Sequence, residues 1–297
     1  MMQLLKAIWN RLHLVDSKWW SWIQRLLVFI VVIYFVGKIA DGWSENQGIL
    51  TDLNIRLFLF SIVVLSISFS LLPIGARMIA RLFFVDIPIL RSFETYFYSQ
   101  AGKYLPGGIW SYVGRIYFFS REGISKNTAF SITILEVFFL ILSGAICFLF
   151  TMYYWNPLPE AIFVFVAGAL IFSLSAVFLG FSYRNIKPML TRLSFNTEVS
   201  LSLFSIACII SIYLFFWGMT GVGFYVLTLA LVEVPFVHFL AFIGLYPLAW
   251  IMGNFVFFMP AGIGVREGML IFLLGFYLEK QQSIGVALIS RAWWIIA

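Results

Sequence analysis

Two segments of the chain combine helix-breaking residues with charges at a repeated spacing. Pro106 precedes Glu136 by 30 residues, and Pro260 precedes Arg291 by 31 residues. Proline removes a backbone donor and glycine allows close backbone approach, so each break predicts a sharp turn with free amides and carbonyls. The predicted hairpin-forming residues are Pro106, Gly107, Gly108, Pro260, Gly262 and Gly264.

The charges near these breaks suit a ligand with an anionic headgroup. A guanidinium group forks onto phosphate oxygens and stays charged, so Arg115, Arg266 and Arg291 are candidate phosphate-binding residues. Carboxylates nearby would balance these arginines in an empty site or meet a cationic or hydroxylated headgroup. The candidate substrate-binding set is Arg115, Arg266, Glu267, Glu136, Arg291, Glu94, Lys103 and Gln100, with no catalytic residue among them.

A structural role is the alternative for the charged pairs. Arg266 and Glu267 also fit a charge pair that caps the start of a helix, and Glu136 and Arg291 fit an ion pair between the two copies. A charge at the centre of a membrane span costs about 2.5–3.5 kcal/mol on the insertion scale, so an unpaired one needs a reason.

Composition indicates a polytopic membrane protein. Hydrophobic residues make up 62% of the 297 residues, charged residues only 11%, and the mean hydropathy is +1.00. A soluble domain has roughly 45–50% apolar and about 25% charged residues. Since one crossing needs about 20 apolar residues, the chain has room for about six to eight spans and for no soluble domain of ordinary size.

The apolar stretches predict where the spans lie. The first four are Leu26–Ala40, Leu57–Ala80, Ser131–Tyr154 and Ile162–Phe181. Leu201–Val232 is too long for one perpendicular helix at about 1.5 Å per residue, and its glycines leave one bent helix or two short ones open. The remaining stretches are Phe236–Met259, Met269–Leu278 and Ile284–Ala297. Met269–Leu278 is too short to cross and predicts half of a re-entrant hairpin.

Charge in the predicted loops indicates the orientation. The N-terminal stretch and the segments after the second and fourth spans are basic, which favours a cytoplasmic location for these regions and for the N-terminus. The Asp41–Asp52 loop is acidic and the Trp155–Glu160 turn has no Lys or Arg, so both are expected to face outward. We interpret the first apolar run as a retained span rather than a cleaved signal.

These elements predict one integral membrane domain over residues 1–297. Residues 1–55 form a basic segment and first span, 56–182 a first repeat and 199–297 a second repeat. The fold class is an all-α transmembrane bundle in which each repeat contains a Pro/Gly-broken re-entrant hairpin. Parallel and inverted repeats both remain open, although inverted repeats with broken helices are a recurring transporter plan.

The two segments resemble the family named after the transmembrane region of lysylphosphatidylglycerol synthase. Met259–Gly268 is similar to that family's Pro-Gly-Gly-Leu-Gly-x-Arg-Glu-Gly signature, with Ala261 in place of a glycine, and Gly102–Gly108 with Glu136 is similar to its first half. The resemblance covers about residues 57–297. The chain departs from the pattern at Val137, where a second arginine is usual, and in the Ile109-Trp110-Ser111 continuation. The substrate of better-known members therefore cannot be transferred.

The resemblance implies a lipid translocator of the flippase type in the cytoplasmic (inner) membrane. The expected ligands are membrane lipids with anionic or polyprenyl-linked headgroups, moved through a polar cavity lined by arginine and glutamate. An accessory membrane subunit that works with an envelope-biosynthesis enzyme on polysaccharide or lipid modification is the alternative, and a transferase on lipid-linked sugars is a weaker one. The resemblance implies that lysyl transfer in larger relatives belongs to a separate soluble domain, which we do not expect within these 297 residues.

Other functional classes find little support in the sequence. Cys147 and Cys208 fall inside predicted spans, and His13 and His238 form no ligand cluster with them, so neither a disulfide nor a metal site is predicted. The glycines around Gly262 lack the strand and spacing of a dinucleotide loop, so no cofactor is expected. The basic balance fits anionic lipid headgroups rather than nucleic acid.

Overall fold

The regular secondary structure of the described residues is entirely helical. The computed structural model describes residues 53–100, 102, 110–155, 164, 168, 202–255, 262 and 264–297. Its α-helices are α3 (Ile55–Leu82), α4 (Ile89–Gln100), α5 (Trp110–Arg121), α6 (Lys126–Thr151), α9 (Leu203–Leu229), α10 (Phe239–Phe255), α11 (Val265–Leu274) and α12 (Lys280–Ile296). Two short 3-10 helices, Met152–Tyr154 and Phe236–His238, flank the long helices. The all-α fold class is therefore confirmed for these residues.

Four of the described helices are long and apolar enough to cross a membrane. They are Ile55–Leu82, Lys126–Thr151, Leu203–Leu229 and Phe236–Asn254, with mean hydropathies of 2.5, 2.5, 2.0 and 1.7. They match the predicted spans at Leu57–Ala80, Ser131–Tyr154, Leu201–Val232 and Phe236–Met259. The chain is thus an integral membrane protein. The predicted spans Leu26–Ala40 and, apart from Val164 and Gly168, Ile162–Phe181 lie outside the described residues.

The glycine-containing stretch forms one continuous helix rather than two. α9 runs unbroken from Leu203 to Leu229, and two of its three glycines, Gly221 and Gly223, make close contacts with neighbouring helices. A Cβ atom at Gly221 would lie 2.5 Å from the Cα atom of Ile243 in α10, and one at Gly223 would lie 3.0 Å from the Trp293 ring. These glycines therefore let α10 and α12 approach α9, a role that their spacing alone does not distinguish from a helix break.

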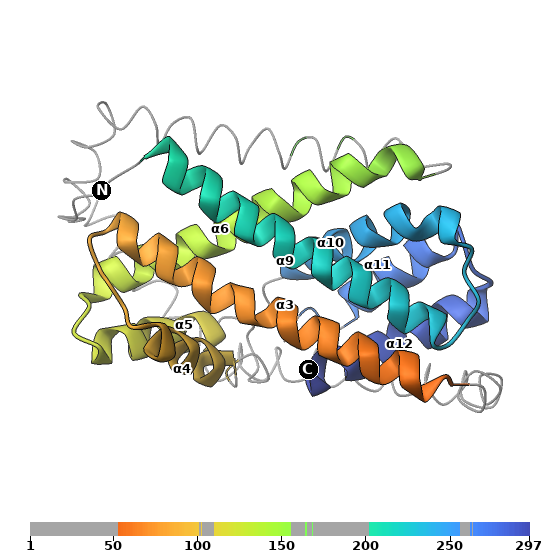
Figure 1. Ribbon diagram of the computed structural model, residues 1–297, viewed down its shortest axis with the longest axis horizontal. Coiled ribbons are helices and arrows are strands. Elements are labelled where there is room, and N and C mark those ends of the chain that lie inside the picture. Colours follow the sequence, from red (N-terminus) through yellow and green to blue (C-terminus); the bar gives the residue numbers. More distant parts are fainter. Residues whose placement is uncertain are drawn as a thin grey trace, which may run out of the picture.

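The broken segments lie toward opposite ends of the molecule. Figure 1 shows α4 and α5 beside the end of α3 at the left, whereas α11 and the start of α12 lie toward the right. α11 has 10 residues, so it rises about 15 Å, half of a hydrocarbon core of about 30 Å. α11 therefore does not cross the bilayer by itself, as predicted from the short Met269–Leu278 stretch.

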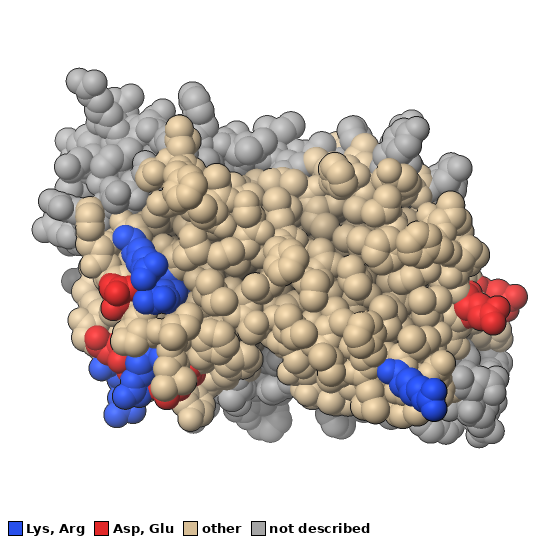
Figure 2. Space-filling model, in the orientation of Figure 1, with Lys and Arg blue, Asp and Glu red and all other residues tan. Residues whose placement is uncertain are grey.

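Charged side chains mark the two ends of the bundle. On the face shown in Figure 2 they gather at both ends of the long axis, and the broad middle is uncharged. At the end of α3, Asp86 accepts from Arg81 at 3.0 Å and from Arg77 at 3.2 Å. The hydrogen bond from Arg81 holds the pKa of the exposed Asp86 carboxyl below its ordinary value. The uncharged middle is the part that suits contact with lipid.

Polar contacts dock the first broken segment onto the long helices. The Ser92 hydroxyl of α4 donates to the carbonyl of Pro73 in α3 at 2.7 Å. Deeper in the bundle, the Trp217 indole of α9 donates to the Leu140 carbonyl of α6 at 2.9 Å. Both bonds satisfy groups that apolar surroundings would otherwise leave unpaired, so they fix the helices in register around the cavity described below.

Candidate functional site

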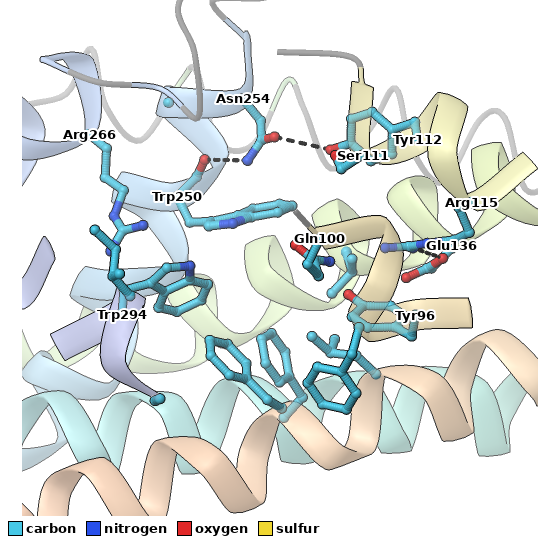
Figure 3. A pocket seen from close by; sticks show the side chains of 18 of the residues that line it. Tyr96, Gln100, Ser111, Tyr112, Arg115, Glu136, Trp250, Asn254, Arg266 and Trp294 are labelled. Carbon is cyan, nitrogen blue, oxygen red and sulfur yellow. Dashed lines mark hydrogen bonds and ion pairs between the residues drawn. The ribbon is translucent and has the colours of Figure 1, made fainter. Parts of the chain in front are cut away.

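A cavity of about 320 Å³ lies where the two broken segments approach each other (Figure 3). Residues from all eight described α-helices line it. The lining residues are Phe69, Leu72, Tyr96, Phe97, Gln100, Ser111, Tyr112, Arg115, Glu136, Leu140, Phe216, Trp250, Gly253, Asn254, Arg266, Arg291, Trp294, Ile295 and Ala297. Arginines and amides thus face a wall of aromatic rings. This part of the molecule is apolar, so the burial of a charge here has a high free-energy cost.

The first segment holds Arg115 in a fully buried setting. At Gly114 α5 packs against α4, and a Cβ atom there would make an ordinary van der Waals contact with Ser99 at 3.6 Å. Arg115 is 2% exposed, forms an ion pair with Glu136 of α6, and donates from Nε to Ser99 Oγ at 3.4 Å. Its guanidinium also lies 4.0 Å from the centre of the Tyr96 ring. The carboxylate neutralises this guanidinium within the protein.

The second segment holds Arg266 in a different setting. Its guanidinium lies 4.6 Å from the Tyr246 ring centre and 4.7 Å from that of Trp294, and its Nη2 donates to the Tyr246 hydroxyl. Arg266 is 4% exposed. Within the described residues it forms no ion pair, and its Nε has no hydrogen-bond partner. Aromatic rings hold this guanidinium without cancelling its charge.

Glycines make the second arrangement possible. Gly262 has φ +65°, and a Cβ atom there would lie 2.9 Å from the carbonyl oxygen of Gly253 in α10. Gly264, with φ +88°, is the N-cap of α11. The left-handed backbone favours glycine at both positions, and the turn places Arg266 against Gly253, where a Cβ atom would meet Arg266 Cβ at 3.1 Å.

Glu267 joins the start of α11 to α12. Its Oε2 accepts from the backbone N–H of Gly264 at 2.7 Å, and its Oε1 pairs with Arg291 Nη1 at 3.1 Å. The carboxylate is therefore both a helix cap and an ion-pair partner. Its negative charge also interacts favourably with the positive N-terminal end of the α11 helix dipole. Arg291, whose side chain is 19% exposed, reaches the cavity from α12.

One hydrogen bond links the two segments directly. The Tyr112 hydroxyl in the first turn of α5 lies 3.3 Å from Asn254 Oδ1 in the last turn of α10. Asn254 in turn donates from Nδ2 to the Trp250 carbonyl at 2.9 Å. In Figure 3 this link lies along one edge of the cavity, with Arg266 and Trp294 on one side and Arg115, Glu136 and Tyr96 on the other.

The structure brings together most of the described candidate residues. Arg115, Glu136, Arg266, Arg291 and Gln100 line the cavity, and Glu267 joins them through Arg291. Glu94 lies apart, since its side chain is 37% exposed and pairs with Arg91 of the same helix at 2.7 Å. The predicted site residues Lys103, Pro106, Gly107, Gly108 and Pro260 lie outside the described residues.

The alternative pairings expected from the sequence are wrong in their partners. Glu136 pairs with Arg115 rather than with Arg291, so both buried ion pairs form within a segment and its following helix. The structural alternative for Arg266 and Glu267 was a charge pair that caps a helix start. Glu267 does cap α11, but its ion-pair partner is Arg291 rather than its neighbour Arg266. Sequence spacing identified the charges, whereas helix rotation decided which of them meet.

Sequence reasoning missed the neutral part of the site. Tyr96, Tyr112, Tyr246, Trp250, Asn254 and Trp294 all contact the cavity or its arginines. Asn254 carried a usable signal, because an amide in an otherwise apolar span requires a partner. The aromatic residues carried none, since rings are common throughout a chain with 34 phenylalanines, 13 tyrosines and 11 tryptophans.

Comparison with known proteins identifies the family of the chain. The sequence matches the family described as the lysylphosphatidylglycerol synthase TM region over residues 22–296. A comparison with curated protein sequences gives no match. Nearly the whole chain lies within the matched range, including all four described spans and both charged segments. The chain therefore belongs to the lysylphosphatidylglycerol synthase transmembrane-region family.

Proposed function

We propose that this protein moves a lipid headgroup across the cytoplasmic membrane, as a flippase. The observation that carries the proposal is the arginine-lined cavity between two broken helical segments. Polar groups in the hydrocarbon region are expensive and face a functional cavity or a partner. A headgroup would pass through this cavity while its acyl or polyprenyl chains stay in the surrounding lipid.

The arrangement of the helices supports a path open in turn to the two leaflets. We infer that α4–α5 and α10–α11 are re-entrant hairpins of two inverted repeats, because they lie toward opposite ends of the bundle (Figure 1). In this proposal α10, although long and apolar enough to cross a membrane, turns back through α11 instead of crossing. Each hairpin would cover the cavity from one side. Small movements of either one would then expose the site alternately, as in transporters built from inverted repeats.

The charge distribution supports the direction of insertion. The Arg77, Arg81 and Arg91 cluster lies at the α4–α5 end, and basic short loops favour the cytoplasmic side. We infer that this end and the N-terminus face the cytoplasm. The first hairpin would then enter from the cytoplasmic side and the second from the outer side. Anionic lipids of the inner leaflet would meet the basic end first.

A role as an accessory membrane subunit is the second candidate, and the two buried ion pairs favour it. Arg115–Glu136 and Glu267–Arg291 satisfy each other without a ligand, as charges that only stabilise a fold would do. Such a subunit would assemble with an envelope-biosynthesis enzyme. Arg266 argues against a purely structural role, because it forms no ion pair within the described residues.

Leaflet-resolved transport in proteoliposomes separates the two functions. Labelled phospholipids and polyprenyl-phosphate lipids would be followed in vesicles with the intact protein, with Arg266→Gln, and with Arg56→Gln as an exposed arginine control. We expect faster transbilayer movement of at least one lipid with the intact protein and the control, and loss of that movement with Arg266→Gln. If no lipid moves faster than in protein-free vesicles, the accessory-subunit role replaces the flippase.

A further inference from the structure

Charges around the cavity do not balance. Arg115 is paired with Glu136, and Arg291 is paired with Glu267. Arg266 lines the same cavity, yet it forms no ion pair within the described residues. The described part of the site therefore holds three guanidinium groups against two carboxylates, an excess of one positive charge.

The environment of Arg266 keeps its charge available. The rings of Tyr246 and Trp294 lie 4.6 and 4.7 Å from the guanidinium carbon, and they attract a cation without neutralising it. The Nε atom is buried and lacks a hydrogen-bond partner within the described residues. Since an unsatisfied buried donor is costly, this atom indicates a place for an acceptor from outside the protein.

The wall between the two arginine centres is neutral, polar and aromatic. Gln100 and Asn254 contribute amides, Tyr112 a hydroxyl and Trp250 an indole ring (Figure 3). Amides and hydroxyls exchange hydrogen bonds with ligand hydroxyls, and an indole face covers the C–H face of a sugar ring. On the far side, Glu136 Oε1 has no hydrogen-bond partner within the described residues and can accept one more hydroxyl.

We propose that the cavity selects a headgroup with one negative charge and an uncharged hydroxylated ring, namely a glycosyl phosphodiester lipid. Its phosphate would bind Arg266, and its sugar would lie between Trp250 and the Gln100 and Asn254 amides. This inference rests on the proposed function, because it assigns the substrate class of the same cavity. The volume of about 320 Å³ suits a headgroup alone, at the lower end of the roughly 300–1,000 Å³ of ligand pockets.

The same geometry disfavours a cationic aminoacyl headgroup. Both oxygens of Glu267 are already used, by Arg291 and by the Gly264 N–H group. Glu136 is fully buried and paired with Arg115. An ammonium group would therefore enter a site with excess positive charge, in which each of these two carboxylates already neutralises an arginine.

Binding of a matched lipid series tests this selectivity. Intrinsic tryptophan fluorescence reports on the site, because Trp250 and Trp294 line it. The purified full chain in detergent micelles would be titrated with three short-chain lipids: a polyprenyl phosphoryl hexose, the corresponding uncharged glycoside, and a lysyl ester of phosphatidylglycerol. We expect the phosphodiester lipid to bind about ten- to a hundredfold more tightly than either of the others.

Variants assign the preference to Arg266. Arg266→Gln should lower the affinity for the phosphodiester lipid to that for the uncharged glycoside, and should leave the latter unchanged. Arg56→Gln, an exposed arginine of α3, is the control and should bind like the intact protein. If Arg266→Gln does not fold by gel filtration and thermal unfolding, Arg266→Lys replaces it and should lower the phosphodiester preference only in part, since lysine keeps the charge and loses the forked geometry.

The outcomes distinguish this inference from the proposed function. Equal or tighter binding of the lysyl ester, or an undiminished phosphodiester preference in the Arg266 variant, would overturn the inference even if lipids are transported. Selective binding without movement of any lipid in proteoliposomes would overturn the flippase and leave the anion-selective headgroup site standing. The methyl ester of the hexosyl phosphate is a soluble analogue without the lipid chain. If it binds as tightly as the lipid, the natural ligand of the site would be a soluble sugar phosphodiester rather than a lipid.

Discussion

The two broken segments share a layout but treat their arginines differently. In each, an arginine of the helix after the break lies over a tyrosine of the helix before it, Arg115 over Tyr96 and Arg266 over Tyr246. In each, an ion pair joins the helix after the break to the helix that follows it, Arg115 of α5 to Glu136 of α6 and Glu267 of α11 to Arg291 of α12. Only in the second does the arginine beside the tyrosine lack an ion pair within the described residues.

This difference follows from where the carboxylate lies. In the first segment Glu136 is on the following helix, α6, and reaches Arg115 directly. In the second the carboxylate is Glu267, next to Arg266 in sequence, where helix geometry directs the two side chains apart. The glutamate thus lies on the second of the two paired helices in the first copy and on the first of them in the second copy. As a result the first copy is neutral, whereas the second carries one positive charge. The first copy is therefore expected to stabilise the fold and the second to bind the ligand.

The largest expected effect is on the stability of the first copy. Glu136→Gln leaves the buried Arg115 charge without a counter-charge, so we expect a loss of about 3–5 kcal/mol in thermal unfolding in detergent. Replacing both partners, by Arg115→Met with Glu136→Leu, should recover most of that loss. Glu94→Gln is the matched control, because its exposed ion pair with Arg91 contributes about 0–1 kcal/mol. Similar losses for both glutamates would contradict the neutral first copy.

A smaller effect is expected at the turn of the second copy. Gly262→Ala places a side chain at φ +65° and within 2.9 Å of the Gly253 carbonyl, so it should cost more than the roughly 1–2 kcal/mol of left-handed strain alone. Gly123→Ala provides the control, since Gly123 has φ +82° and nothing within 4 Å of its Cβ position. Equal shifts in the unfolding temperature would show that the contact with Gly253 is unimportant.

Loss of the second ion pair should matter less than loss of the first. Glu267→Gln keeps an amide oxygen for the Gly264 N–H group and removes only the charge facing Arg291, which is 19% exposed. We expect a loss of about 1–2 kcal/mol, measured in the same unfolding assay. A loss as large as that of Glu136→Gln would show that the two pairs are energetically equivalent.

The smallest expected change in stability is at Arg266. Arg266→Met removes cation–π contacts worth about 0.5–2 kcal/mol, but it also removes the desolvation penalty of an unpaired buried charge. We expect a net change within about 1 kcal/mol, together with loss of headgroup binding. Arg115→Met is the paired experiment and should lose several times more stability, because it strands Glu136. Equal losses would remove the distinction between the two copies.

The sequence predicted the all-α membrane fold and several residues that line the candidate site for a simple reason. Apolar runs such as Leu57–Ala80 have few stable conformations in lipid other than a helix, so their length and composition predict the spans. Charges such as Arg115, Arg266 and Glu136 are costly in apolar surroundings, and a shared cavity was the predicted consequence. The similarity around Met259–Gly268 correctly indicated the family.

Only the tertiary structure decided how these parts meet. Gly221 and Gly223 lie within one continuous helix, at the places where neighbouring helices approach it closely. They do not mark the end of a helix. Ion-pair partners depend on the rotation of α5, α6, α11 and α12 about their axes, which sequence spacing does not specify. Composition alone determined that the chain enters a membrane and that its charges need partners, whereas three-dimensional packing decided that Glu136 neutralises Arg115 and that Arg266 contacts Tyr246 and Trp294 rather than a carboxylate of the described residues.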